Sequence, residues 1–501
     1  LWLEEMAQRC HTSPFRMLKA ALPPGWLGQR VVSTVKERRL WWVSLSDSSA
    51  SLEADLPERQ ACLVAKLQEL GGGAWQRDLV AAGFQAGLVQ ALVRRERLVR
   101  ELRLATDGQR STLSLGLALA TEAPRTLTDE QQVAIDTFKD QPDGGGVLLW
   151  GITGSGKTEV YLQLAADELA AGRHVLLLTP EIGLIPQLVD RCRRRFGSRV
   201  LEYHSGCTER ERVRTWRNSL DAEEPLVIVG TRSSIFLPLS PLGLIVLDEE
   251  HDSSYKQESP MPCYHARDLA MARVQREGGR LLLGSATPSL ETWIQLAPEG
   301  PLALARLQQR ISAQPLPPVQ IIDMRHELAD GHRRLISRAL MDRLSKLPEQ
   351  GEQAVVLVPR RGYSTFLSCR SHWCDYRAPV TTTCGHCGSS AFKPFGAGTQ
   401  RVLEQLESEL EGLRLLRFDR DTTGGRDGHR RLLDQFAAGE ADVLVGTQML
   451  AKGMDLPRVT LAAVLAADGL LHRPDLRAGE QALQLLLQLA GRAGRGERPG
   501  Q

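Results

Sequence analysis

Short runs of consecutive apolar residues alternate with longer amphipathic stretches from Thr126 to the end of the chain. A short apolar run bounded by Gly, Pro or charged residues is typical of a strand that is buried on both faces, and the stretches between the runs have a helical period. The runs are GVLLW (146–150), HVLLL (174–178), PLVIVG (225–230), LGLIVLD (242–248) and RLLLGS (280–285), then QAVVLV (353–358), LRLLRF (413–418), ADVLVG (441–446) and VTLAAVLA (459–466).

A Pro-rich passage, QPLPPVQ at residues 314–320, separates the first five runs from the last four. Proline lacks the backbone donor that a helix or a central strand needs, so such a passage favours a connection between domains. Strands that alternate with helices predict parallel sheets. The pattern therefore predicts an α/β fold with two tandem parallel-sheet domains, residues 123–312 and 313–501.

Upstream of Thr126 the pattern changes to short helical periods. Residues 1–31 hold one amphipathic stretch that is too short for a domain, and residues 45–56 are Ser-rich and acidic, as in a linker. The periods in residues 57–105 predict a winged-helix-like domain within residues 32–122. The last helix, expected over residues 85–103, has either a solvated basic face or a phosphate-contacting one; its arginines are Arg94, Arg95, Arg97, Arg100 and Arg103.

The overall charge adds little to this picture, because 62 basic and 60 acidic residues leave a formal net charge of +2. A nucleic-acid partner would therefore have to meet local basic patches and not a global field. The sequence has no apolar run of the roughly 20 residues that span a bilayer. The opening stretch LWLEEMAQRC is acidic where a secretory signal is basic. We expect a cytoplasmic protein without a membrane partner, whose natural N-terminus lies upstream of Leu1.

A phosphate-binding loop follows the first apolar run. The stretch GITGSGKT (151–158) has the spacing G-x-x-x-x-G-K-T between a predicted strand and a predicted helix. Gly151, Gly154 and Gly156 let the backbone N–H groups, including that of Ser155, face phosphate oxygens at a helix N-terminus. Lys157 would reach the β- and γ-phosphates of ATP, and the Thr158 hydroxyl would bind Mg²⁺.

Two groups of charged residues complete an ATPase. Asp248 and Glu249 end the run LGLIVLDEE, where Asp248 would hold Mg²⁺ through water and Glu249 would polarise the attacking water. Arg492 and Arg495 stand three apart in QLAGRAGRG and would neutralise charge on the transferring phosphoryl group. Because these arginines belong to the second predicted domain, hydrolysis would be coupled to motion between domains.

Eight motifs stand in the order found in superfamily 2 helicases: LTDEQ, GITGSGKT, TPEIGLIPQ, GTRSSIF, DEEH, GSATPS, VGTQMLAKGMDLP and QLAGRAGR. The stretches DEEHDSSYKQESPMPCYHARDLA, PRRGYS and DGLLHRPDLRAGE resemble more closely the primosomal replication-restart helicases, the primosomal protein N′ (PriA) family. The resemblance runs from about Met17 to the last residue. It implies that the two domains are RecA-like helicase lobes.

The resemblance also assigns roles to single residues. It implies that Gln131 reads adenine, that Gln488 senses the γ-phosphate, and that Ser285, Ala286 and Thr287 couple hydrolysis to motion. The residues that it places on the DNA strand are Thr231, Arg232 and Thr447, together with an aromatic-rich loop that contains Tyr255, Lys256, Gln257, Tyr264, His265 and Arg267.

The chemistry of this loop allows two interpretations. The rings of Tyr255 and Tyr264 could stack on unpaired bases while Lys256 and Arg267 meet phosphates. Alternatively, the loop is packed and its tyrosines are buried. We favour the first interpretation because the loop begins close behind Asp248, so that base contact and hydrolysis would be adjacent.

By resemblance, the protein is an ATP-dependent helicase that moves 3′→5′ on single-stranded DNA, recognises stalled or abandoned replication forks and restarts replication by primosome assembly. Its implied partners are single-stranded and forked DNA, primosome proteins and the single-stranded-DNA-binding protein, and we expect a monomer in the bacterial cytoplasm. Two alternatives stay open. One is a loader that binds DNA and partners with a vestigial motor, and the other is an RNA or duplex translocase with the same fold.

Four of the nine cysteines cluster in the second domain: Cys369, Cys374, Cys384 and Cys387. The C-x-x-C pair at 384–387 is typical of a zinc knuckle, and four soft ligands within twenty residues can close one structural zinc site. His372 or His386 could replace a thiolate. The family has eight cysteines here, so residues 364–395 resemble a shortened zinc-ribbon-like insertion. The alternative is a metal-free loop.

The family resemblance also concerns the two ends of the chain. Residues 1–31 resemble the tail of the family's N-terminal domain, which binds the 3′ end of DNA, and the family continues beyond Gln501 with a C-terminal domain that is absent from this sequence. We therefore expect this chain to hydrolyse ATP weakly and to unwind DNA poorly.

Overall fold

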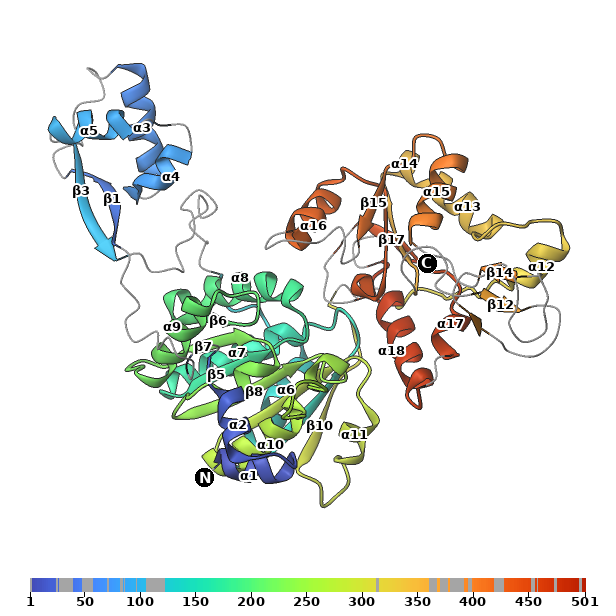
Figure 1. Ribbon diagram of the computed structural model, residues 1–501, viewed down its shortest axis with the longest axis horizontal. Helices are drawn as coiled ribbons and strands as arrows, with labels where there is room; N and C mark the ends of the chain where they lie inside the picture. Colours follow the sequence, from blue (N-terminus) through green and yellow to red (C-terminus); the bar gives the residue numbers. More distant parts are fainter. Residues whose placement is uncertain are drawn as a thin grey trace. The chain divides into compact units, whose positions relative to one another are not determined.

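The computed structural model describes most of the chain (Figure 1). The described residues are 2–23, 26, 39–46, 57–69, 72–81, 84, 86–95, 97–104, 122–311, 315–359, 367–369, 377–378, 392–394, 399–418, 428–451, 456, 458–472, 475–494 and 498–501.

A seven-stranded sheet is formed by residues 146–307, and all five apolar runs predicted in this part of the chain are strands. The strand order is β10-β4-β9-β8-β5-β7-β6. Strand β4 pairs in parallel with β9 and β10, and β7 pairs in parallel with β5 and β6. The strands are β4 (Gly146–Gly151), β5 (His174–Leu178), β6 (Val200–Tyr203), β7 (Val227–Gly230), β8 (Leu242–Asp248), β9 (Arg280–Ser285) and β10 (Leu302–Leu307).

The helices between these strands begin where the sequence offers N-terminal caps. Thr128 and Gln131 form a reciprocal capping box at the start of α6, and Thr208 and Glu211 form another at the start of α9. Helix α7 begins at Lys157, directly after the phosphate-binding loop. The helices of this region are α6 (Asp129–Lys139), α7 (Lys157–Ala170), α8 (Ile185–Phe196), α9 (Glu209–Leu220), α10 (Ala266–Glu277) and α11 (Leu290–Ile294).

A second parallel sheet has the order β15-β16-β11-β17. Its strands are β11 (Gln353–Leu357), β15 (Leu415–Phe418), β16 (Val443–Gly446) and β17 (Val459–Val464). Neighbouring residues of β11 belong to different cores: Val355 packs with residues of α16 (Gly428–Ala438) and α18 (Ala478–Ala490), whereas Val356 packs with residues of α13 (Arg338–Ser345) and α15 (Thr399–Glu409). Because helices cover both faces, the strands are mostly apolar, as the sequence predicted.

Four short helices and a small sheet complete the region around the second parallel sheet. The helices are α12 (Met324–Ala329), α14 (Leu347–Gln350), α17 (Asp468–Leu471) and the 3₁₀ turn η6 (Gln448–Ala451). The antiparallel sheet, of order β13-β12-β14, lies within the predicted cysteine-rich insertion; its strands are β12 (Leu367–Cys369), β13 (Arg377–Ala378) and β14 (Phe392–Pro394). The two parallel sheets confirm the predicted α/β fold class.

The N-terminal region contains helices and a separate antiparallel sheet of order β2-β1-β3. Its elements are α1 (Trp2–Arg9), α2 (Pro14–Ala21), β1 (Arg39–Leu45), α3 (Glu58–Glu69), β2 (Gly73–Trp75), α4 (Gln76–Ala81), α5 (Ala86–Arg94) and β3 (Leu98–Leu104). Three helices and a three-stranded sheet are the content of a winged-helix module.

One predicted element in this module is wrong. The helix expected over residues 85–103 ends at Arg94, and residues 98–104 form the strand β3. Strand β3 pairs with β1 along its whole length, from Leu98 opposite Leu45 to Leu104 opposite Arg39. Partners far apart in the sequence thus outweigh local helix propensity here. Arg94 is therefore on a helix, whereas Arg100 lies on the sheet with its guanidinium 3.8 Å from the centre of the Trp41 ring.

By its internal contacts the chain divides into two compact units. One comprises residues 1–126, 162–245 and 254–279, and the other comprises residues 127–161, 246–253 and 280–501. The phosphate-binding loop, the acidic pair and α18 all belong to the second unit. The bounds of the four domains predicted from the sequence remain predictions. None of the helices in the described part of the chain is long and apolar enough to cross a membrane.

Candidate active site

The phosphate-binding loop links β4 to α7 and has a backbone that requires glycine. Gly154 and Gly156 have φ angles of +87° and +83°, in a region that residues with a side chain rarely adopt. A Cβ at Gly156 would lie 2.4 Å from the Gln131 amide nitrogen, and one at Gly151 would lie 2.6 Å from Ser155 Oγ. The loop therefore has no room for a side chain at residues 151 and 156, and its φ angle favours glycine at residue 154.

The polar groups of this loop fit a phosphate ligand. The Ser155 hydroxyl is buried and has no hydrogen-bond partner among the described residues. Lys157 Nζ donates a hydrogen bond of 2.8 Å to the Gly151 carbonyl, so its ammonium group lies over the loop, and Thr158 follows it in the first turn of α7. A helix N-terminus with a lysine and unpaired donors is the arrangement that binds phosphate. The residues present thus fit the predicted ATP site.

Gln131 has a different set of contacts from the predicted one. Its side chain is 2% exposed; the amide nitrogen donates to the Ser155 carbonyl at 3.0 Å, and the amide oxygen accepts from the Thr128 N–H at 3.0 Å. In this structure Gln131 therefore braces the phosphate-binding loop and caps α6. Its role in reading adenine stays a prediction.

The acidic pair ends strand β8. Asp248 Oδ1 accepts a hydrogen bond of 3.0 Å from the Tyr161 hydroxyl. Burial raises the pKa of Asp248 to about 6, and the neighbouring charge of Glu249 adds to the rise. Glu249 has a φ of +50°, a strained conformation for a residue with a side chain, which turns the chain sharply after the strand.

Glu249 stays ionised at neutral pH. Burial acts to raise the pKa of this carboxyl, but nearby positive charges, Lys157 first among them, outweigh burial and lower the pKa. The two carboxyls are thereby pushed apart in acidity, which is the usual basis for dividing roles between neighbouring acids.

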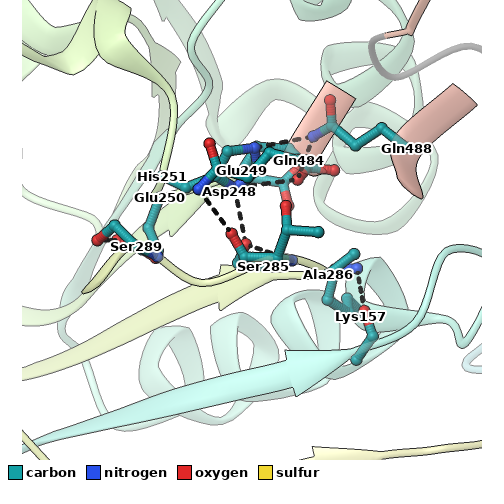
Figure 2. A network of polar contacts seen from close by, with 12 residues as sticks. Lys157, Asp248, Glu249, Glu250, His251, Ser285, Ala286, Ser289, Gln484 and Gln488 are labelled. Carbon is teal, nitrogen blue, oxygen red and sulfur yellow. Dashed lines mark hydrogen bonds and ion pairs between the residues drawn. The ribbon is translucent and has the colours of Figure 1, made fainter. Parts of the chain in front are cut away.

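A chain of hydrogen bonds joins Glu249 to helix α18 (Figure 2). The Gln488 amide nitrogen donates to Glu249 Oε2 at 3.3 Å and lies 2.8 Å from His251 Nε2. Because an amide nitrogen only donates, His251 Nε2 accepts, and the proton on Nδ1 is free to bond Ser285 Oγ at 2.7 Å. Gln488 thus contacts the acidic pair where the sequence predicted a γ-phosphate sensor.

The segment Ser285–Ala286–Thr287 has one hydrogen bond within it and, besides the bond from His251, two to its surroundings. Ser285 Oγ accepts from the Thr287 N–H at 3.0 Å, the Ala286 carbonyl accepts from the Trp150 indole at 3.2 Å, and the Thr287 carbonyl accepts from Gln484 at 3.4 Å. The predicted coupling segment therefore contacts both the strand before the phosphate-binding loop and helix α18.

The two predicted arginines differ in what the structure describes. Arg492 is 3% exposed, and its charge is among those that lower the pKa of Glu249, so it lies near the acidic pair. Arg495 lies outside the described residues. The role of both arginines in hydrolysis stays a prediction.

The prediction that Tyr255 and Tyr264 stack on bases is wrong for this structure. Tyr255 is fully buried and its hydroxyl donates to the Leu178 carbonyl at 2.9 Å. Tyr264 is 2% exposed and packs edge-on against Phe236 at 5.1 Å. Neither ring face is available to a base, so the packed alternative holds for both tyrosines. Sequence reasoning could not decide this, because Phe236 is distant in the chain.

Several of the remaining residues predicted to contact DNA belong to this loop or are hydrogen-bonded to it. Arg232 donates to the carbonyls of Ser254 and Lys256 at 3.1 and 2.7 Å, next to Thr231. Arg267 is 7% exposed and forms an ion pair with Asp268, whereas Lys256 is exposed. Gln257 binds two proline carbonyls and His265 caps α10, so both serve the fold. Thr447 is 6% exposed and directly follows β16.

Sequence reasoning gave no role to three residues that hold the acidic pair. Tyr161 lies one helical turn after Lys157, a spacing that puts both on one face of α7 and could have revealed it. Glu250 is 1% exposed and accepts hydrogen bonds from Ser289 and Thr292. His251 stands in the quoted DEEH motif, but its partner Gln488 is 237 residues away.

The predicted zinc site lies outside the described residues. Cys374, Cys384 and Cys387 are not described, and of Cys369 only the backbone of β12 is. Among the residues that the structure does describe, no group of three His, Cys, Asp or Glu side chains is placed to hold a metal ion.

Comparison with known proteins identifies the class that this fold and site define. The DEAD/DEAH box helicase model matches residues 128–295, and the helicase conserved C-terminal domain matches residues 395–497. The chain is therefore a helicase-type protein of superfamily 2. A solved structure of RecG bound to a three-way DNA junction has 20% identity and a TM-score of 0.46, covering 76% of this chain and 43% of that one.

Curated relatives identify the family within this class. A replication restart protein PriA of Synechocystis sp. is 45% identical over 482 residues, which cover 89% of this chain and 57% of the relative. The PriA of Haemophilus influenzae is 33% identical over 500 residues, which cover 94% of this chain and 67% of the relative. The chain belongs to the replication restart protein PriA family. It spans about half the length of several curated relatives that it matches.

Proposed function

We propose that this chain carries the motor of an ATP-dependent 3′→5′ DNA helicase that recognises stalled or abandoned replication forks and restarts replication by primosome assembly. The observation that carries the proposal is the hydrogen-bonded link from Gln488 of α18 to Glu249 and His251, beside the phosphate-binding loop. Membership of a family whose members are named for replication restart supports the choice of DNA as the substrate.

In this proposal the side chains around the loop divide the work of hydrolysis. Residues 151–158 and Asp248 would hold ATP and Mg²⁺. When bound, ATP would supply the phosphoanhydride bond that is cleaved, and Mg²⁺ would balance the negative charge of the phosphates. Glu249 is the base, because its carboxylate is held by Gln488 beside the phosphate-binding loop and stays ionised. Gln488 orients Glu249, and Arg492 and Arg495 balance negative charge on the phosphoryl group.

The hydrogen bonds of His251 suggest how hydrolysis reaches the DNA. His251 bonds Ser285, whose neighbours Ala286 and Thr287 bond Trp150 and Gln484. A shift of Gln488 would therefore move the coupling segment. The proposed DNA contacts are Thr231, Arg232, Lys256, Arg267 and Thr447. The proposed partners are forked DNA, primosome proteins and the single-stranded-DNA-binding protein, bound by a monomer in the bacterial cytoplasm.

ATP turnover by this chain with single-stranded DNA, duplex DNA and RNA tests the proposal. We expect single-stranded DNA to stimulate turnover at least about tenfold, and Lys157→Ala to abolish about 99% of it, because the lysine meets the transferring phosphates. Lys139→Ala, on an exposed lysine of α6, is the control. Greater stimulation by RNA or duplex DNA would instead identify another translocase. DNA binding without turnover would identify a loader.

The direction of movement and the zinc site have their own tests. The test of direction compares duplexes that carry a 3′ or a 5′ single-stranded tail. A 3′→5′ motor can load only on the 3′ tail, so only that duplex should be unwound. We also propose one Zn²⁺ on Cys369, Cys374, Cys384 and Cys387. Metal analysis should find one zinc per chain and less in Cys384→Ser; a zinc-free wild-type protein would contradict the site.

A further inference from the structure

The four residues after β10 run along the phosphate-binding loop. The Ile311 N–H donates to the Gly154 carbonyl at 3.0 Å, and the Ile152 N–H donates to the Leu307 carbonyl at 3.1 Å. The N–H groups of residues 308 and 309 both donate to Glu130 Oε2, at 2.8 and 3.2 Å. Hydrogen bonds thus fix this segment both to the loop and to the start of α6.

Arg310 in this segment reaches from the phosphate-binding loop to the end of helix α18. Its side chain is 5% exposed, and its aliphatic part lies beside Gly154, where a Cβ would be 3.7 Å from Arg310 Cγ. The guanidinium donates through Nη1 to the Gly494 carbonyl at 3.1 Å and through Nη2 to the Gly491 carbonyl at 3.4 Å.

The end of α18 is a favourable place for this guanidinium. Gly491 is the C-cap of the helix, and the last carbonyls of a helix lack partners within it and carry partial negative charge. A planar guanidinium can serve two such carbonyls at once. Gly491 also packs directly on the loop, since a Cβ there would lie 2.6 Å from Thr153 Cβ. The same short segment carries Gln488 before Gly491 and Arg492 after it.

We propose that Arg310 is a positioning residue that holds the C-terminal end of α18 against the phosphate-binding loop. The inference rests on the proposed function, because it concerns the same ATP site. Arg310 keeps Gln488 within reach of Glu249 and His251, and Arg492 near the acidic pair. It acts through these residues and not by binding the nucleotide. Its loss therefore slows turnover and leaves ATP affinity intact.

Arg310→Gln and Arg310→Lys test the proposal, with Arg325→Gln as the control. Arg325 is 89% exposed and pairs with Asp323, two residues away. The readouts are kcat and KM for single-stranded-DNA-stimulated ATP turnover, the Kd of a fluorescent ATP analogue, and amide hydrogen exchange over residues 485–491.

For Arg310→Gln we expect kcat to fall about tenfold or more, the analogue Kd to change less than about threefold, and exchange over residues 485–491 to speed up. Arg310→Lys keeps the positive charge but cannot bond the Gly491 and Gly494 carbonyls at the same time. Its kcat and exchange rate should therefore lie between those of wild type and Arg310→Gln. Arg325→Gln matches wild type in all three readouts.

Two results would overturn the proposal. A Kd about tenfold higher with unchanged kcat would make Arg310 a nucleotide ligand, and unchanged kcat with unchanged exchange would leave it no positioning role. If wild-type turnover is not stimulated by DNA, the proposed function fails, but hydrogen exchange still decides the role of Arg310. Should Arg310→Gln not fold, Arg310→Lys decides by the same readouts.

Discussion

Glu249 and Glu250 follow each other in the chain but have opposite surroundings. Glu249 is partly exposed and meets Lys157, His251 and Gln488, whereas Glu250 is 1% exposed and accepts three hydrogen bonds from Ser289 and Thr292. A buried carboxylate with all its partners in the fold is typical of a structural anchor. The sequence DEEH alone could identify the acidic motif but could not divide these two roles.

Replacing each glutamate in turn distinguishes the structural role of Glu250 from the proposed catalytic role of Glu249. Glu250→Ala removes the acceptor of three buried hydrogen bonds and should lower the free energy of unfolding by about 3 kcal/mol. Glu249→Gln should leave stability near that of wild type while abolishing ATP turnover. Urea denaturation and ATPase assays of the two variants measure this. Equal losses of stability in both variants would show that the division is wrong.

At the residue scale, the sequence predicted which residues belong to the site better than it predicted what their side chains contact. The glycines of the phosphate-binding loop and Lys157 stand at fixed spacing, so one motif locates them all. Gln131, Tyr255 and Tyr264 are where the motifs put them, but their side chains bind the chain's own carbonyls or pack inside it. Long-range packing decides the direction of an amphipathic side chain, and no local pattern encodes it.

The strands of the two parallel sheets were predictable because both faces of these sheets are covered. In β5 and β7 every residue is buried, so the apolar runs stand out from the helices around them. The end of α5 was not predictable, because Leu98 to Leu104 become a strand only by pairing with β1. A strand in a small half-exposed sheet carries a weaker local pattern than one buried on both faces.

His174 at the start of β5 makes the stability of this element depend on pH. Its ring is 3% exposed and Nδ1 accepts from the Leu226 N–H, next to β7, at 3.0 Å. Burial lowers the pKa of His174, and the charge of Arg273 adds to this; the hydrogen bond that the ring donates to the Ser240 backbone opposes both. Below the unfolded pKa of about 6.5, the unfolded chain therefore binds a proton that the folded chain does not.

Neutral His174 thus makes its whole contribution to the free energy of unfolding above about pH 6.5, and this contribution is lost as the pH falls below that value. His174→Asn, which keeps an acceptor for Leu226 but cannot titrate, should lose less stability than wild type between pH 7.5 and 5.5. Urea midpoints at the two pH values measure the difference. A variant whose midpoint falls as steeply as that of wild type would show that His174 does not titrate as argued.

On the scale of the whole molecule, the site joins side chains that lie far apart in the sequence. Gln488 and Glu249 are 239 residues apart, yet they share a hydrogen bond. Motif order predicted that these segments belong to one ATPase, because each motif needs the others for hydrolysis. It could not give the atoms in contact, nor reveal Arg310, which lies in none of the motifs.

The central claim is that ATP hydrolysis by the loop of the first sheet requires the end of α18. Single-turnover hydrolysis of ATP by Arg492→Ala, with single-stranded DNA present, tests this most directly, and Arg401→Ala on the exposed side of α15 is the control. We predict a rate at least about 100-fold below that of wild type with ATP-analogue binding unchanged. Hydrolysis by Arg492→Ala at the wild-type rate would contradict the account.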